Sequence, residues 1–185
     1  MAKLILVGGG ARSGKSRFAV QLAESLGPKR VFLATAEALD QEMHARIARH
    51  QIERAERFRT VDCPLRLPQA VVAQTDTDVQ LIDCLTLWIT NLLGQGLSND
   101  DILSQVDQLI DAVATAPGHV IIVSNEVGMG LVSLHELGRR FQDCTGWAHQ
   151  RLARAASEIY LAALGCVLRL KPAPVAVVSP EFENP

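Results

Sequence analysis

Residues 4–16, Leu-Ile-Leu-Val-Gly-Gly-Gly-Ala-Arg-Ser-Gly-Lys-Ser, decide the fold of this chain. The run 4–7 is short and apolar, which is typical of a buried strand. Residues 9–16 match the pattern G-x-x-x-x-G-K-[ST], in which glycines let the backbone curl so that its N–H groups converge on phosphate oxygens. Residues 16–26 then read as a helix, whose positive N-terminal end favours the same phosphates. This order of strand, loop and helix predicts a nucleoside triphosphate site.

The loop pattern predicts specific roles for two of its residues. The Lys15 ammonium is expected to reach the β- and γ-phosphates, and the Ser16 hydroxyl is expected to bind Mg²⁺. A chance glycine-rich turn is the alternative, and the strand and helix on either side disfavour it. The predicted nucleotide-binding residues of the loop are Gly9, Gly10, Ala11, Arg12, Ser13, Gly14, Lys15 and Ser16.

Short aliphatic runs alternate with longer amphipathic ones along the rest of the chain. Strands are predicted at 31–34, 79–82, 120–123, 159–164 and 167–170. Helices are predicted at 39–57, briefly after Pro68, at 101–114 behind a Ser98 cap, and up to about residue 157. Apolar strands separated by helices predict an α/β fold of the P-loop NTPase type, with a mostly parallel central sheet and helices on both faces. We expect one catalytic domain over 1–171 and an extended or loose tail over 172–185.

Composition excludes several classes of protein. The 185 residues are 48% hydrophobic, enough for one packed domain. The 18 basic and 20 acidic residues nearly cancel, so there is no basic field of the kind a nucleic-acid binder carries. No apolar run approaches the ~20 residues that a membrane span needs. The four cysteines are widely spaced, which indicates reduced thiols and a cytoplasmic protein rather than a zinc or redox motif.

Two acidic residues follow predicted strands. Asp83 directly follows the run 79–82, at the edge of an open α/β sheet where ligands bind and where a carboxylate can hold Mg²⁺ beside the loop serine. Its alternative role is to cap the next helix. Glu126 lies in the segment SNEVGMG at 124–130, and a polar loop that leaves a buried strand is expected to line the site. An ordinary strand-to-helix turn has the same composition.

A histidine and two arginines interrupt the apolar stripe of the predicted helix 39–57. The apolar stripe ends at Ile47. The next positions on the same face are His50 and Arg54, and Arg46 lies beside them one turn earlier. Guanidinium groups favour the neutral, nucleophilic imidazole and bind phosphoryl oxygens, as a histidine that forms a covalent N–P bond requires. The alternative is that the helix leaves the core and His50 is a solvated surface residue. The other histidines are interpreted as structural or bystanders: His44, His119, His135 and His149.

Taken together, these segments resemble the bifunctional adenosylcobinamide kinase/adenosylcobinamide-phosphate guanylyltransferase family of cobalamin biosynthesis. The resemblance extends to about Lys171. It is carried by the phosphate loop, by Ala34-Thr35, by EMHARIARH at 42–50 with Arg54, by DCLT at 83–86 and by SNEVGMG at 124–130. The histidine and SNEVGMG segments are far more specific than the loop. The chain departs from the family pattern at Phe58, Ser133, Gln142 and His149.

The resemblance implies two reactions. In the first, a hydroxyl of adenosylcobinamide takes the γ-phosphate of ATP or GTP. In the second, a histidine attacks the α-phosphate of GTP, releases pyrophosphate, and passes GMP to adenosylcobinamide phosphate. The family's histidine falls on His50, and the resemblance also suggests a homo-oligomer such as a trimer. The implied site is completed by Lys15 in catalysis, Ser16 and Asp83 on Mg²⁺, and Thr35, Arg46 and Arg54 on the nucleotide. No kinase base is evident from the sequence: Glu126 is the candidate, and the alternative is that positioning and charge neutralisation suffice.

Two other functions fit parts of this pattern. A plain small-molecule kinase needs the loop and Asp83 but gives His50 no task. A GTP-binding regulatory protein usually reads guanine through an Asn-Lys-x-Asp run after a strand. Here the corresponding strand exit is Ser-Asn-Glu-Val at 124–127, which disfavours that function.

Overall fold

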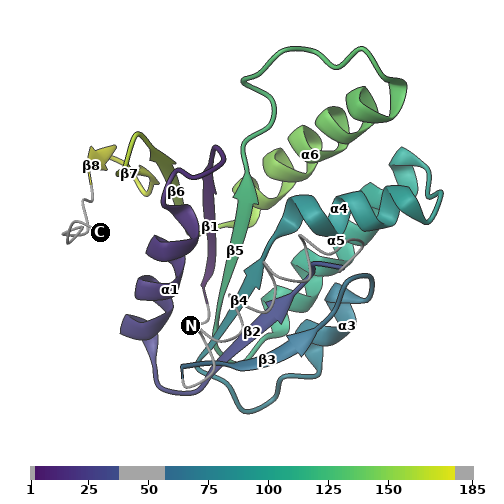
Figure 1. Ribbon diagram of the computed structural model, residues 1–185. Coiled ribbons are helices and arrows are strands. Elements are labelled where there is room, and N and C mark those ends of the chain that lie inside the picture. Colours follow the sequence, from purple (N-terminus) through teal and green to yellow (C-terminus); the bar gives the residue numbers. More distant parts are fainter. Residues whose placement is uncertain (1–2, 38–56, 178–185) are drawn as a thin grey trace.

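The computed structural model describes residues 3–37 and 57–177 of the chain. A twisted sheet runs through the centre of this part (Figure 1). Its strands follow the spatial order β3-β2-β4-β5-β1-β6-β7-β8. In chain order they are β1 (Leu4–Gly9), β2 (Arg30–Ala34), β3 (Arg59–Asp62), β4 (Val79–Asp83), β5 (His119–Asn125), β6 (Glu158–Ala163), β7 (Cys166–Lys171) and β8 (Ala176–Val177).

The strands from β3 to β6 pair in parallel, and β7 and β8 add an antiparallel margin. The central strands β1, β4 and β5 are apolar and buried along most of their length, as parallel strands covered on both faces must be. Between β6 and β7 the chain reverses through Leu164 and Gly165, both with positive φ, which suits a two-residue hairpin turn. The short strand β8 lies within the segment for which an extended tail was expected.

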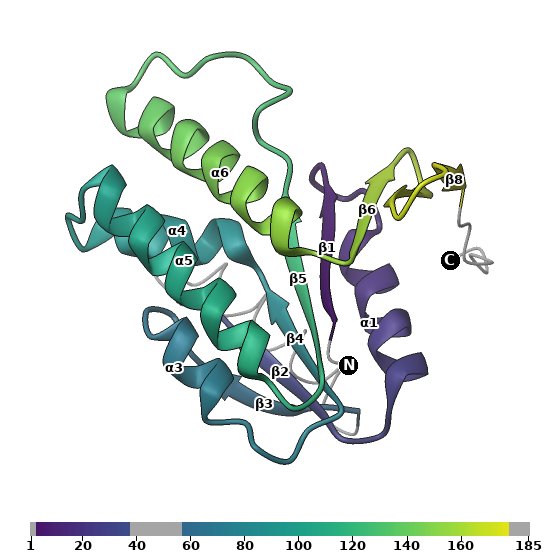
Figure 2. The ribbon, with the colours of Figure 1, turned by 180° about the vertical axis from the view of Figure 1, so that it is seen from behind.

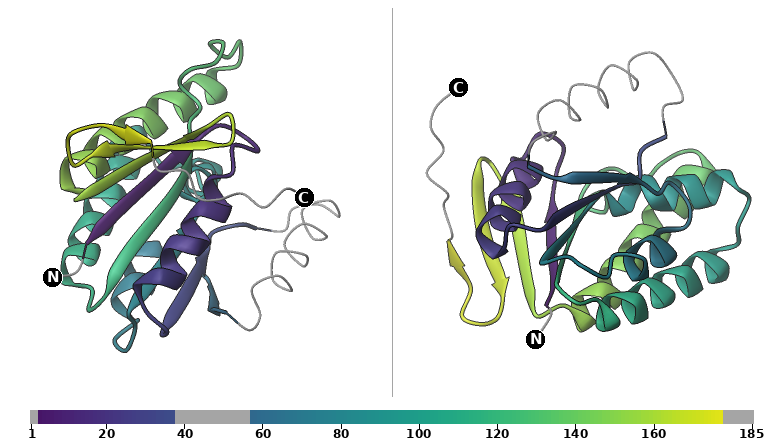
Figure 3. Two further views of the ribbon diagram at one scale, coloured as in Figure 1. Left: turned by 90° about the vertical axis from the view of Figure 1, so that its left-hand side faces the viewer. Right: turned by 90° about the horizontal axis from the view of Figure 1, so that it is seen from below.

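Helices cover both faces of the sheet, as the sequence predicted. Helix α1 packs on one face (Figure 1), and the other helices of the described part lie on the opposite face (Figure 2). The two views of Figure 3 show the same division. The helices are α1 (Lys15–Leu26), α3 (Leu67–Val72), α4 (Leu85–Gly94), α5 (Asn99–Thr115) and α6 (Glu136–Ala155).

The predicted strands are present, and the Ser98 cap opens α5 through a capping box with Asp101. Strand β3 was missed because its side chains are mostly exposed. Helix α4 was missed because LTLWITNLLG is apolar on nearly every side and shows little helical periodicity. Helix α6 begins only at Glu136, so 126–135 is a loop rather than the start of a helix. The predicted helix 39–57 falls almost wholly outside the described residues.

No helix in the described ranges is both long enough and apolar enough to cross a membrane.

Candidate functional site

The carboxyl ends of the parallel strands bring the predicted loop and both predicted acids to one edge of the sheet. Strand β5 lies between β1 and β4, so Gly9 is opposite Asn125, and Asp83 is opposite Val123. The Glu126 N–H donates to the Gly9 carbonyl at 3.0 Å, which ties the acid to the first residue of the phosphate loop. This is the edge at which open α/β sheets bind ligands.

The loop backbone takes a shape that glycine makes possible. A Cβ on Gly9 would lie 2.5 Å from the Ala162 carbonyl oxygen, so the strand approaches its neighbour too closely for a side chain. Gly14 caps α1 with φ of 91°, in the left-handed region that favours glycine. With no acidic residue in its first turn, α1 presents an uncompensated positive end to the loop. These are the features of an anion cradle.

Lys15 is a buried cation at the start of α1, with 8% of its surface exposed. Its Nζ donates to the Gly10 carbonyl at 3.0 Å, so the side chain folds back over the loop. Burial and the charge of Asp83 raise the pKa of the Cys84 thiol, whereas the charge of Lys15 opposes that rise. The charges of Lys15 and Asp83 therefore act on the same thiol with opposite effects on its pKa.

The Ser13 hydroxyl is another polar group buried in the loop. Its Oγ has no hydrogen-bond partner among the described residues. A buried polar group without a partner costs free energy, which an arriving hydrogen-bonding ligand can recover.

Ser16 and Asp83 offer oxygen donors, which are the ligands that Mg²⁺ prefers. Asp83 is the last residue of β4, and the N-cap of α4 is Cys84, one residue later. The alternative role of Asp83 as the helix cap is therefore not the observed one. In the described ranges no group of three or more His, Cys, Asp or Glu side chains forms a metal site. A magnesium site here would be of the kind in which the nucleotide phosphates supply most of the ligands.

Thr35 is fully buried directly after β2, where it links β2 to β4. Its hydroxyl donates to the Cys84 carbonyl and accepts from the Cys84 N–H, both at 2.8 Å. Asn91 donates to the Thr35 carbonyl at 2.8 Å, and Asn125 donates to the Thr86 hydroxyl at 3.0 Å. This network holds the exits of β2, β4 and β5 together. A direct contact between Thr35 and the nucleotide stays a prediction.

Glu126 is fixed by its own loop and faced by a histidine. Its Oε1 accepts from the Gly128 N–H at 2.6 Å, and its Oε2 lies 3.8 Å from His149 Nδ1. The other ring nitrogen, Nε2, lies 2.6 Å from the Ser124 hydroxyl. Sequence reasoning treated His149 as structural. The signal that could have found it is its position four residues after the buried Thr145, on the face of α6 that packs on the sheet.

Three predicted site residues lie outside the described residues: Arg46, His50 and Arg54.

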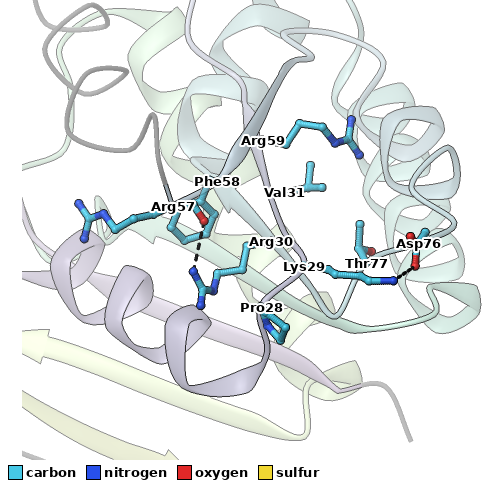
Figure 4. Close-up of a pocket in the computed structure, with 9 residues that line it drawn as sticks. All are labelled: Pro28, Lys29, Arg30, Val31, Arg57, Phe58, Arg59, Asp76 and Thr77. Atoms are coloured by element: carbon cyan, nitrogen blue, oxygen red, sulfur yellow. Dashed lines mark hydrogen bonds and ion pairs between the residues drawn. The ribbon is translucent and has the colours of Figure 1, made fainter.

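A pocket of about 430 Å³ lies at the opposite edge of the sheet, where β2 and β3 begin (Figure 4). Its cations are already engaged. Lys29 pairs with Asp76 at 2.6 Å, and Arg30 donates to the Gly27 carbonyl at 2.7 Å. The pocket adjoins none of the predicted site residues in the described part, and we assign the chemistry to the phosphate-loop edge.

The family described as cobinamide kinase/cobinamide phosphate guanyltransferase matches residues 5–170. A bifunctional adenosylcobalamin biosynthesis protein of Pseudomonas aeruginosa is 41% identical over 178 residues, which cover 95% of this chain and 100% of the relative. A protein of the same description from Salmonella typhimurium is 39% identical over 181 residues, with 91% of this chain and 99% of the relative covered.

Solved structures show the same fold at low sequence identity. A protein of Pyrococcus horikoshii OT3 matches with a TM-score of 0.60 at 12% identity, covering 98% of this chain and 94% of its own. A solved ATPase domain matches with a TM-score of 0.55 at 13% identity, covering 95% of this chain and 80% of its own. These likenesses show the fold alone, and the fold is that of the P-loop NTPases.

Proposed function

This chain belongs to the cobinamide kinase/cobinamide phosphate guanyltransferase family, and on that premise we propose how its residues divide the work of the two reactions. The enzyme is a kinase and a nucleotidyltransferase of adenosylcobalamin biosynthesis. Both reactions act on the phosphates of a nucleoside triphosphate, ATP or GTP in the first and GTP in the second. One phosphate loop, residues 9–16, serves both.

In the kinase step the loop N–H groups and Lys15 bind the β- and γ-phosphates and neutralise the charge that develops as the phosphoryl group moves. The acceptor hydroxyl attacks the γ-phosphorus, the bond from that phosphorus to the bridging β-γ oxygen breaks, and a nucleoside diphosphate leaves. Glu126 accepts the hydroxyl proton. Ser16 and Asp83 would hold Mg²⁺, which when bound would further neutralise the phosphate oxygens.

In the nucleotidyl step the His50 imidazole attacks the α-phosphorus of GTP. An N–P bond forms, the bond from that phosphorus to the bridging α-β oxygen breaks, and pyrophosphate leaves. The phosphate of cobinamide phosphate then attacks the same phosphorus and releases His50. Arg46 and Arg54 bind the oxygens of the phosphoryl group under attack, and Thr35 contacts the nucleotide. The assignment of His50 and both arginines rests on the sequence.

The scheme is supported by the arrangement of three charged side chains in a chain of this family. The buried Lys15, the carboxylate of Asp83 and the tethered Glu126 come from three separate elements to the same edge of the sheet. A cytoplasmic location and a homo-oligomer, such as a trimer, complete the proposal. All four cysteines are free thiols, which fits a reducing compartment.

The test is to incubate the protein with Mg²⁺ and α-labelled GTP and to map any acid-labile, base-stable adduct by peptide. We expect label on His50, none in the His50→Ala variant, and full labelling of the His44→Ala control, which changes a histidine of the same segment. The kinase step should survive in His50→Ala. Persistent labelling of that variant contradicts the histidine assignment, and absence of label in the unaltered protein favours the plain kinase.

A further inference from the structure

A half-buried histidine lies between Glu126 and the sheet. His149 lies on α6, with only 20% of its side chain exposed, and reaches the exit of β5 from across the helix–sheet interface. Its Nε2 is 2.6 Å from the hydroxyl of Ser124, a fully buried residue of β5. Its Nδ1 faces the Glu126 carboxylate. One ring thus links a rigid strand to the acid that follows it.

The charge of Glu126 selects one arrangement of protons in this group. A neutral imidazole carries one N–H, and a carboxylate beside Nδ1 favours that proton on Nδ1. Nε2 is then an acceptor, and the Ser124 hydroxyl donates to it. Burial lowers the pKa of His149, and the charge of Glu126 partly offsets this, so the ring is neutral at pH 7. Ser124 therefore anchors the ring, and the ring presents a donor to Glu126.

The carboxylate itself has one firm tether and one loose contact. Oε1 accepts from the Gly128 N–H at 2.6 Å, within its own loop. Oε2 is 3.8 Å from Nδ1, longer than a hydrogen bond, so a shift of about 1 Å completes the contact. The tether to Gly128 holds only one of the two carboxylate oxygens. The imidazole that faces the other oxygen is itself held between a helix and a strand.

We propose that His149 is a positioning residue for the kinase step, whose Nδ1–H orients the Glu126 carboxylate toward the acceptor hydroxyl while Ser124 holds the ring. This inference rests on the proposed role of Glu126 as proton acceptor. It assigns the orientation of the carboxylate to Nδ1 alone, so substitutions that replace one ring nitrogen at a time can distinguish this role from a role in packing.

Two amide substitutions distinguish the two nitrogens. The amide of asparagine reaches the position of Nδ1, and that of glutamine, one bond longer, reaches the position of Nε2. We expect His149→Asn to retain the kinase kcat within about twofold and His149→Gln to lower it by about tenfold to a hundredfold, because a small misplacement of a reacting group costs that much. The KM for the nucleotide should be unchanged in both. The same pair of substitutions at the exposed His135, which caps α6, should leave kcat unaltered.

A purely structural histidine gives the opposite order, since glutamine keeps the partner of the buried Ser124 and asparagine does not. Equal effects of the two substitutions, or a larger loss in His149→Asn, overturn the inference. The Glu126→Gln variant separates this outcome from failure of the proposed function. If Glu126→Gln keeps the full kinase rate, the proton-acceptor role is wrong. If it lowers the rate, the difference between the two His149 variants should vanish in the Glu126→Gln background.

Discussion

At the scale of single residues, the charge of Lys15 is the feature on which nucleotide binding depends most directly. The ammonium is buried at the start of α1 and donates to the Gly10 carbonyl, so a positive charge is already in place at the phosphate loop. A polyphosphate is the kind of ligand that such a charge binds through charge-assisted hydrogen bonds. The loop is therefore organised for an anion before one binds.

Replacement of Lys15 by alanine should weaken binding of Mg·GTP by about tenfold to a hundredfold, since a hydrogen bond to a charged group contributes about 1.5–3 kcal/mol. Isothermal titration calorimetry measures the change. The matched control is Lys29→Ala, which removes an exposed lysine at the opposite edge of the sheet and should leave the affinity as it was. Equal affinity in Lys15→Ala and the unaltered protein contradicts the proposed phosphate cradle.

A second prediction at this scale concerns His149 and pH. Burial lowers the pKa of its imidazole from the ordinary 6.5, so the unfolded chain takes up a proton at a higher pH than the folded chain does. The contribution of His149 to stability is therefore complete above pH 6.5 and is lost as the pH falls through the folded value. In urea unfolding at pH 7.5 and 5.5, the free energy of unfolding should fall less in His149→Asn than in the unaltered protein. His135→Asn should show the full fall, and an identical fall in all three proteins counts against this account.

At the scale of elements, α5 shows how a local sequence signal sets a helix boundary. Ser98 accepts from the Asp101 N–H at 3.2 Å, and the Asp101 carboxylate accepts from the Ser98 N–H at 3.3 Å. Two N–H groups that the helix itself cannot satisfy are thereby paired. Both partners lie within one turn of each other, so the pairing needs no tertiary contact.

Ser98→Ala should lower the free energy of unfolding by about 1 kcal/mol, the usual cost of removing an N-cap side chain. Urea denaturation followed by circular dichroism measures it. The control is Ser104→Ala, the same chemical change at an exposed position within α5, where alanine favours the helix and no loss is expected. A comparable loss in both variants would show that the cap contributes nothing specific.

At the scale of the whole molecule, the loop between β5 and α6 presents an apolar surface to solvent. Leu131 and Leu134 are 95% and 94% exposed. The backbone beneath them is held to α6, because Gln142 donates to the Leu131 carbonyl at 3.1 Å and Arg139 donates to the Leu134 carbonyl at 2.9 Å. Contiguous exposed apolar side chains on a fixed backbone are typical of an interaction surface.

We expect a second copy of the chain to cover this loop in the proposed oligomer. The Leu131→Asp/Leu134→Asp double variant should then have the molar mass of one 20.1 kDa chain, since a charge is costly to bury in an apolar interface. Light scattering after size-exclusion chromatography gives the mass. Leu164→Asp, which changes a fully exposed leucine in the β6–β7 turn, should leave the assembly intact. An oligomer that survives the double substitution places its interface elsewhere.

Local sequence determined the parts of this protein whose interactions join neighbouring residues. The phosphate loop, the α5 cap and the apolar strands could be predicted because each depends on a contiguous run and its periodicity. Asp83 and Glu126 could be assigned to one edge because parallel strands end on the same side. His50, by contrast, was assigned from its pattern and its family, and it lies outside the described residues.

Only the tertiary structure decided how those parts meet. The insertion of β5 between β1 and β4 places Glu126 against Gly9, and no local pattern encodes that strand order. The contact between Ser124 and His149 joins positions 25 residues apart on a strand and a helix. Such contacts form because several elements are buried in one core, which brings residues distant in sequence together. The packing free energy that decides this arrangement depends on the whole chain and cannot be predicted from a short segment.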